Sequence, residues 1–237
     1  MSRPIEALSI RISESVGAVD AVLLRPDAAR FLLVLAHGAG AGMHHPFMGR
    51  IADELAGCGV ATLRYQFPYM QQREKRPDSP QVLAASVRAA VATASELVPG
   101  LPLLAGGKSL GGRMTSLAYA GERPGANAGT AAVSGFVFVG FPLHPAGRPG
   151  IQRAEHLARV QAPMLFLQGT RDALADLELL RPVCAKLASR ATLHVVNGAD
   201  HSFHVLKRSG RTDAEVVTEL ARTVAAWAGG LGVRHRG

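Results

Sequence analysis

The sequence predicts a single three-layer α/β domain with a doubly wound, mostly parallel sheet. From Phe31 onward, short apolar runs recur, each followed by glycines and then by an amphipathic stretch. Runs that are apolar on both faces suit strands that helices cover on both sides. Their alternation with helical patterns is typical of right-handed β-α units. Because no internal repeat or Pro/Gly/Ser-rich linker divides the chain, we expect one domain over residues 1–237.

The first two strands differ from the later ones and predict an antiparallel pair. Leu8, Ile10 and Ile12 alternate with polar residues, as in a half-exposed strand. Val19–Leu24 is the expected partner strand, after a turn at Ser15–Gly17.

Six β-α units follow this pair. The predicted strands are residues 31–36, 60–65, 101–106, 135–140, 163–169 and 191–196. The predicted helices are residues 47–56, 81–97, 113–120, 174–189 and 212–229, and the predicted loops include 71–80 and 141–150.

The helical patterns also predict inward faces and one cap. The first helix is expected to bury Met48, Ile51, Ala52 and Leu55, and the second to bury Val82, Ala85, Ala89 and Val91. Thr212 and Glu215 have the spacing of a capping box, which would open the last helix.

Composition excludes several classes of protein. With 48% hydrophobic and 19% charged residues, the 237-residue chain is not globally disordered. The net charge of +8 suggests nucleic-acid binding as an alternative function. However, basic residues cluster only at 73–76 and 233–237, aromatic residues are not interleaved with them, and no nucleic-acid-binding motif is present. We therefore expect no nucleic-acid partner.

Cysteine usage and apolar run lengths favour a cytoplasmic protein without a metal site. Cys58 and Cys184 form neither a disulfide framework nor a zinc-ligand pattern. The N-terminal residues lack the apolar core of a signal peptide. The longest apolar stretches are far below the ~18 residues of a membrane span, so no membrane partner is expected.

The sharpest chemical signal is the G-x-S-x-G motif formed by Gly107, Ser109 and Gly111. It lies between a predicted strand and a predicted helix, which is the context of a nucleophile elbow. A phosphate-binding loop is the alternative, because Gly-Lys-Ser also ends a Walker A motif. The position of that motif's first glycine is, however, Pro102. We therefore predict that Ser109 is a nucleophile.

A nucleophilic serine needs a base that is oriented by an acid. Asp172 and His201 follow two later strands, at the sheet edge where open α/β sheets hold their sites. We predict that these residues converge on Ser109, with Asp176 as the alternative acid and His204 as the alternative base.

Two further residues near these positions have other expected roles. Asp200 adjoins His201 in sequence and is a poor orienter, because adjacent side chains diverge. His194 lies within an apolar strand and is expected to be a hydrogen-bonded structural residue.

The small residues of His37-Gly38-Ala39-Gly40 predict an oxyanion hole after the strand at 31–36. Such residues let backbone amides approach a reacting oxygen. The amide of Leu110, next to the nucleophile, is one expected donor, and an amide near Ala39 or Gly40 is the other.

In this order and spacing, the HGxG, GxSxG, GTRD and DHSF motifs resemble the α/β-hydrolase superfamily over nearly the whole chain. GGKSLGGR, FPLHPAG and QGTRDAL are similar to segments of its small dienelactone-hydrolase-like branch. The resemblance implies an eight-stranded sheet, a catalytic triad of Ser109, Asp172 and His201, and no cofactor. Dienelactone hydrolases proper use cysteine as the nucleophile, so their substrate is not carried over.

The resemblance also implies an open site, because residues 141–163 are too few for a substantial helical cap. We expect a small-molecule acyl substrate, an ester or thioester, cleaved through an acyl-enzyme by a cytoplasmic serine esterase. The alternative function is a non-catalytic binding or scaffold protein with a vestigial triad. The residues expected to contact substrate are His37, Gly38, Gly40, Phe67, Tyr69, Met70 and His144.

Overall fold

The computed structural model describes residues 5–121 and 132–231. The strands in these ranges form one eight-stranded sheet. The strands are β1 (Ile5–Ser13), β2 (Gly17–Leu24), β3 (Phe31–Ala36), β4 (Val60–Tyr65), β5 (Leu103–Lys108), β6 (Gly135–Val139), β7 (Met164–Gly169) and β8 (Ala191–Val196). Their order across the sheet is β1-β2-β4-β3-β5-β6-β7-β8. β2 runs antiparallel to β1 and β4, and all other neighbours are parallel. The predicted doubly wound sheet is therefore confirmed.

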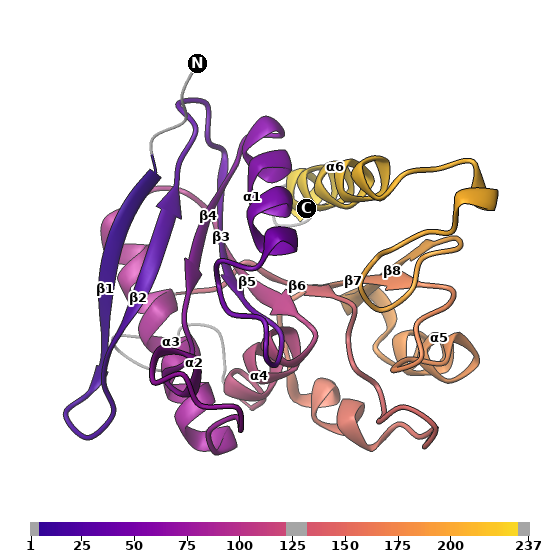
Figure 1. Cartoon of the computed structure of the whole chain (residues 1–237), viewed down its shortest axis with the longest axis horizontal. Coiled ribbons are helices and arrows are strands. Elements are labelled where there is room, and N and C mark those ends of the chain that lie inside the picture. Colours follow the sequence, from indigo (N-terminus) through magenta and orange to yellow (C-terminus); the bar gives the residue numbers. More distant parts are fainter. Residues whose placement is uncertain (1–4, 122–131, 232–237) are drawn as a thin grey trace.

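Helices cover both faces of the sheet (Figure 1). They are α1 (Pro46–Gly57), α2 (Pro68–Gln71), α3 (Pro80–Leu97), α4 (Leu110–Ala118), α5 (Leu177–Lys186) and α6 (Asp213–Leu231). Three 3₁₀ turns complete the described elements: η1 (Gln152–Arg159), η2 (Ala188–Arg190) and η3 (Lys207–Ser209). α1 and α6 pack on one face, and α3, α4 and α5 pack on the other.

One predicted helix face is wrong. α3 buries Leu83, Val87, Ala90 and Ala94, whereas Val82, Ala85 and Ala89 are only partly buried, and Val91 alone matches the expectation. Small apolar residues occupy nearly every turn of this helix, so hydrophobic periodicity does not single out one side. In contrast, the expected face of α1 is correct, because this helix buries Met48, Ile51, Ala52 and Leu55.

The predicted capping box is present at the start of α6. The Thr212 amide donates to Glu215 Oε2 at 2.7 Å, and the Glu215 amide donates to Thr212 Oγ1 at 3.2 Å. These two bonds satisfy amides that would otherwise lack acceptors.

No substantial cap interrupts the described part of the fold between β6 and β7. This segment is a loop followed by η1, which packs beside α4. Neither η1 nor the short helix α2 was predicted from the sequence. The carboxyl ends of β3, β5, β7 and β8 are therefore not covered by an inserted domain.

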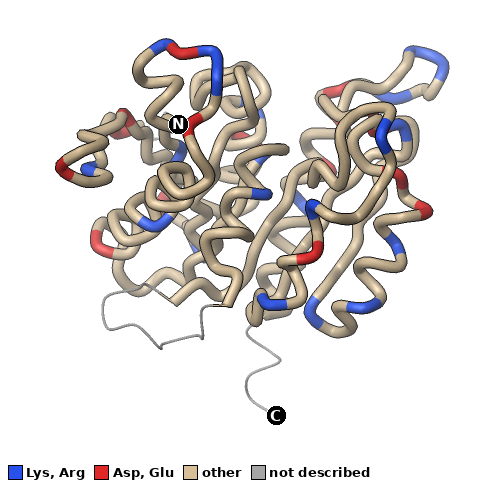
Figure 2. Tube along the Cα trace, turned by 90° about the horizontal axis from the view of Figure 1, so that it is seen from below, with Lys and Arg blue, Asp and Glu red and all other residues tan. Residues whose placement is uncertain are grey.

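Charged side chains are spread over many elements. Figure 2 shows Lys and Arg on both halves of the molecule, with Asp and Glu between them. No helix among residues 5–121 and 132–231 is long and apolar enough to cross a membrane.

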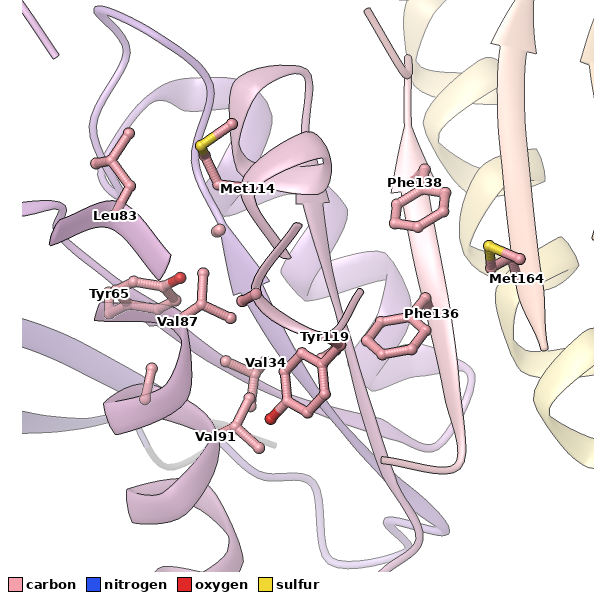
Figure 3. Close-up of a cluster of buried hydrophobic side chains, with 14 of the residues drawn as sticks. Val34, Tyr65, Leu83, Val87, Val91, Met114, Tyr119, Phe136, Phe138 and Met164 are labelled. Carbon is pink, nitrogen blue, oxygen red and sulfur yellow. The ribbon is translucent and has the colours of Figure 1, made fainter. Parts of the chain in front are cut away.

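The larger hydrophobic core lies between the sheet and α3, α4 and α5. In Figure 3, Val87 of α3 lies beside Val34 of β3, and Phe136 and Phe138 of β6 extend the cluster toward Met164 of β7; Met114 of α4 belongs to the same core. This core holds β5 and α4 together. The turn that carries Ser109 joins these two elements and is therefore anchored on both sides.

Candidate active site

Ser109 occupies the tight turn between β5 and α4. Its backbone has φ +50° and ψ −115°, a conformation that residues with side chains rarely adopt. Its amide donates to the Val139 carbonyl of β6 at 3.1 Å, and its carbonyl accepts from the Arg113 amide at 3.1 Å. Strained backbone of this kind persists where surrounding structure over-determines it and is concentrated at functional sites.

The two glycines of the motif are required by contacts with backbone. A Cβ on Gly107 would lie 2.5 Å from the Ala36 carbonyl oxygen. A Cβ on Gly111 would lie 2.6 Å from the carbonyl oxygens of both Ala36 and His37. Real Cβ atoms essentially never come within 3.0 Å of such atoms. The two glycines of the G-x-S-x-G motif are therefore needed because the turn packs directly against the end of β3.

The structure brings Ser109, His201 and Asp172 together in one hydrogen-bonded chain. The distance from His201 Nε2 to Ser109 Oγ is 2.9 Å, and that from His201 Nδ1 to Asp172 Oδ2 is 2.8 Å. A carboxylate can only accept, so Nδ1 carries the proton and Nε2 accepts from the serine hydroxyl. Nε2 is thus in position to take the serine proton.

Asp172 is buried and held by groups other than His201. Its Oδ1 accepts from the Leu174 amide at 2.8 Å, and its Oδ2 also accepts from the Gln168 side-chain amide. Gln168 lies near the end of β7 and is fully buried. Gln168 was not predicted as a site residue, although a glutamine inside an apolar strand, four residues before the predicted acid, was a visible signal.

The alternative acid and the neighbouring aspartate serve local structure. Asp176 precedes α5, and its Oδ1 accepts from the Glu178 amide at 2.9 Å, which makes it an N-cap. Asp200 Oδ1 accepts from the amides of Ser202 and His204 at 2.8 and 3.0 Å. Asp200 thus shapes the turn that presents His201.

The other two histidines near the end of β8 have their own acidic partners. His204 is exposed and pairs with Asp213 at 2.9 Å, and hydrogen bonding to this carboxylate raises the pKa of His204. His194 pairs with Glu219 of α6 at 2.7 Å. Neither makes a hydrogen bond to Ser109 in the described part of the chain.

In the loop after β3, the Gly40 amide has an acceptor, whereas the Ala39 amide has none among the residues that the structure describes. The Gly40 amide donates to the Tyr69 hydroxyl at 3.2 Å. Ala39 lines the same pocket as Ser109. Leu110 opens α4, and the first amides of a helix have no acceptor within it.

His37 supports the loop after β3 and does not line the pocket around Ser109, which corrects the expectation that it contacts substrate. It is fully buried; its Nδ1 donates to the Gly38 carbonyl at 2.8 Å, and its Nε2 accepts from the Phe67 amide at 3.0 Å. Burial lowers the pKa of His37 to about 4, so it is neutral at pH 7. With both ring nitrogens engaged, it ties the oxyanion-loop candidate to the segment after β4.

Most other expected substrate contacts also lie outside the pocket that contains Ser109. Phe67 and Tyr69 are buried in the core, Met70 packs near Gly42, and Gly40 is engaged with Tyr69. His144 is buried and joins the loop after β6 to the start of α5, because its Nε2 accepts from the Asp176 amide at 3.0 Å. Only Gly38 of that set lines the pocket. The aromatic and histidine side chains of this set are therefore packing residues. The sequence pattern alone does not distinguish such residues from residues that contact substrate.

The pocket around Ser109 has a volume of about 320 Å³. Its lining residues are Gly38, Ala39, Ala41, His45, Phe47, Met48, Lys108, Ser109, Leu174, His201 and Ser202. Beside the reactive groups, one wall is apolar and comes from the start of α1. From the sequence, Lys108 entered only the phosphate-loop alternative, and Phe47 and Met48 were expected in a helix without a site role.

Among the described residues, no cluster of three or more His, Cys, Asp or Glu side chains could hold a metal ion.

Comparison with known proteins finds a family match over most of the chain. The profile described as "Alpha/beta hydrolase domain" matches residues 29–229. A dienelactone hydrolase from Anabaena variabilis superposes with a TM-score of 0.71 at 23% identity, covering 96% of this chain and 97% of that one. An alpha-beta serine hydrolase homologue from Coxiella burnetii superposes with a TM-score of 0.72 at 19% identity, covering 92% and 96%.

Two further similarities differ in kind. A serine hydrolase without a lid from Xanthomonas campestris superposes with a TM-score of 0.70 at 19% identity, covering 96% of each chain. A putative phosphoribosyl transferase from Mycobacterium tuberculosis is 30% identical over 179 residues, which are 75% of this chain and 38% of that protein. This chain thus matches well under half of the length of that relative.

Proposed function

The chain belongs to the alpha/beta hydrolase domain family, and from this premise we propose that it is a serine hydrolase that cleaves a carboxylic ester or thioester. The resemblance to the α/β-hydrolase superfamily, expected from the motifs, is confirmed by the family match, and the dienelactone hydrolase from Anabaena variabilis shares the fold. The observation that carries the proposal is the hydrogen-bonded chain from Ser109 through His201 to Asp172, at 2.9 and 2.8 Å.

In the proposed first half-reaction, Ser109 Oγ attacks the substrate carbonyl carbon while His201 Nε2 takes the hydroxyl proton. Asp172 holds the imidazole in the required tautomer and stabilises the imidazolium. The amides of Leu110 and Ala39 donate to the oxyanion of the tetrahedral intermediate. When the intermediate collapses, His201 returns the proton to the departing alcohol or thiol, which leaves an acyl group on Ser109.

In the second half-reaction, water replaces the departed group. His201 Nε2 takes a proton from the water as its oxygen attacks the acyl carbon. The bond from the acyl carbon to Ser109 Oγ then breaks, Oγ regains the proton from His201, and the carboxylic acid leaves. No other reactant is needed.

The size and position of the pocket support small acyl groups as substrates. A volume of about 320 Å³ is at the low end of ligand sites, and an apolar wall from Phe47, Met48 and Leu174 suits a short carbon chain. We propose that p-nitrophenyl esters of two to six acyl carbons are cleaved faster than the ten-carbon ester. A maximum at the ten-carbon ester would contradict this proposal.

The decisive experiment combines turnover with covalent labelling. Wild type is expected to hydrolyse p-nitrophenyl acetate, and Ser109→Ala is expected to lose this activity. Ser95→Ala, a serine change on α3, serves as the matched control and is expected to keep it. A fluorophosphonate is expected to add once to wild type and not to Ser109→Ala in intact-mass spectrometry. Equal hydrolysis by wild type and Ser109→Ala would overturn the assignment.

The same labelling tests the alternative of a non-catalytic binding protein, which would leave Ser109 unlabelled. The name of the Mycobacterium tuberculosis relative supports no second candidate function, because the alignment spans 38% of that protein. The mixed charge distribution in Figure 2 supports a small-molecule substrate over a nucleic-acid partner.

A further inference from the structure

Lys108 has a position that the proposed mechanism does not use. It is the last residue of β5, directly before Ser109, and it is one of the residues that line the pocket with Ser109 and His201. Its Cγ lies 3.6 Å from the position a Cβ on Gly38 would take, and its Nζ lies 3.1 Å from the equivalent position on Gly140. The side chain therefore spans from the end of β3 to the end of β6 and forms part of the pocket wall.

The surroundings of the Lys108 ammonium are poor in acceptors. Nζ lies 5.7 Å from the centre of the Phe203 ring, a cation–π contact. In the described ranges it makes no hydrogen bond and no ion pair. Burial lowers the pKa of Lys108 to about 8, although the charges of Asp172 and Asp200 act in the opposite direction. The group is therefore mostly cationic at pH 7.

The two carboxylates whose charges act on Lys108 already have other donors. Asp172 accepts from His201, Gln168 and the Leu174 amide. Oδ1 of Asp200 accepts from two amides of its own turn. A charge-assisted hydrogen bond is stronger than a neutral one, the more so where water is partly excluded. A carboxylate bound in the pocket would therefore be a favourable partner for the partly buried Lys108 ammonium.

The pocket admits such an acceptor without repulsion. None of its lining residues is Asp or Glu, and Lys108 is the one lining Lys or Arg among the described residues. We propose that Lys108 is a specificity residue that selects substrates with an anionic group, a carboxylate, close to the scissile carbonyl. This inference rests on the proposed serine hydrolase function.

The test compares two esters of equal size that differ in charge. Monomethyl succinate carries the carboxylate, and methyl succinamate carries a neutral amide in its place. Wild type is expected to prefer the anionic ester, and Lys108→Met is expected to lower kcat/KM for it by about 10–100-fold, as for loss of a charge-assisted hydrogen bond. The same variant is expected to change kcat/KM for the neutral ester by less than about 3-fold.

Two further variants separate charge from folding. Lys108→Arg keeps the cation and is expected to keep the preference, and Lys186→Met, at the exposed end of α5, is expected to change neither ester. Thermal unfolding checks that each variant is folded. Equal losses for both esters in Lys108→Met, or no loss for either, would overturn the inference.

A binding measurement makes the result independent of turnover. In Ser109→Ala, saturation-transfer NMR is expected to detect monomethyl succinate more strongly than methyl succinamate, and a second change, Lys108→Met, is expected to remove the difference. Equal binding of the two esters would overturn the role of Lys108. Missing fluorophosphonate labelling of wild type would instead overturn the serine hydrolase proposal.

Discussion

Replacing Gly111 by alanine places a methyl group against two backbone carbonyls at once. The new Cβ would lie 2.6 Å from the carbonyl oxygens of Ala36 and His37. Since Cβ atoms essentially never approach within 3.0 Å, both oxygens must retreat by about 0.4 Å or α4 must shift. β3 is paired on both sides, with β4 and β5, so its end cannot move freely.

The expected cost follows from this double overlap. Overpacking in a rigid interior costs roughly 1–3 kcal/mol and occasionally more. Because two carbonyls are displaced and neither belongs to a flexible side chain, we expect about 3 kcal/mol, at the upper end of that range. For a domain of this size each kcal/mol corresponds to about 2–4 °C, so the Tm of Gly111→Ala is expected to fall by about 6–12 °C.

Gly229→Ala is the matched control, because it makes the same chemical change where there is space. Gly229 lies in the last turns of α6, and nothing lies within 4 Å of the position that a Cβ would take there. Alanine in a helix is favoured over glycine by roughly 0.5–1 kcal/mol, so the Tm is expected to rise slightly. Circular dichroism melts of both variants decide the matter. A Tm for Gly111→Ala within about 1 °C of wild type, well below the expected shift, would refute the reasoning.

Three other predictions address the acid, its support and buried histidines. Asp172→Asn is expected to lower kcat/KM for p-nitrophenyl acetate by about 10²–10⁴-fold. Asp176→Asn, which keeps an N-cap, is expected to change kcat/KM by less than about 3-fold, and equal losses in the two variants would contradict the proposed role of Asp172. Gln168→Leu is expected to lower the same quantity by about 10–100-fold, because a hydrogen bond to a charged group is lost; an unchanged rate would show that the Leu174 amide suffices. Burial lowers the pKa of both His37 and His156 to about 4, so the unfolded state binds more protons below pH 6.5, and stability present at pH 7 is lost as the pH falls. Urea titrations are expected to show that the free energy of unfolding falls by about 2 kcal/mol per histidine between pH 7 and pH 5. His37→Gln is expected to reduce this pH dependence, and the same change with pH in the variant and in wild type would contradict the prediction.

Local constraints explain why much of the site could be predicted from sequence. The elbow needs glycines because a Cβ at Gly107 or Gly111 would lie within 2.6 Å of backbone oxygens at the end of β3, and this requirement is visible in the short G-x-S-x-G motif itself. Asp172 and His201 follow strands, and parallel strands bring their carboxyl ends to one edge of the sheet. All six apolar runs from Phe31 onward correspond to strands, although β5 begins and ends two residues later than predicted. For the central strands, burial on both faces needs uninterrupted apolar residues.

Features that depend on packing between distant elements were not predictable. The inward face of α3 is set by the sheet beneath it, and its alanine-rich sequence carries no preference for either side. His37 and Tyr69 have the chemistry of substrate-contacting residues, yet their hydrogen bonds to Phe67 and Gly40 make them supports. Lys108 lines the pocket because the chain turns sharply after it, and no pattern in the sequence assigns a direction to its side chain.

The position of β8 at the edge of the sheet has a consequence for how the molecule folds. Ser109 follows the central strand β5, whereas His201 follows β8 and lies 92 residues further along the chain. The reactive pair therefore forms only after the outermost strand has joined β7, and contacts of such long sequence separation are slow to form. During refolding from urea, the appearance of fluorophosphonate labelling at Ser109 therefore reports when the sheet is complete. It should lag behind, and never precede, the fluorescence change of Trp227, which packs near the start of β6.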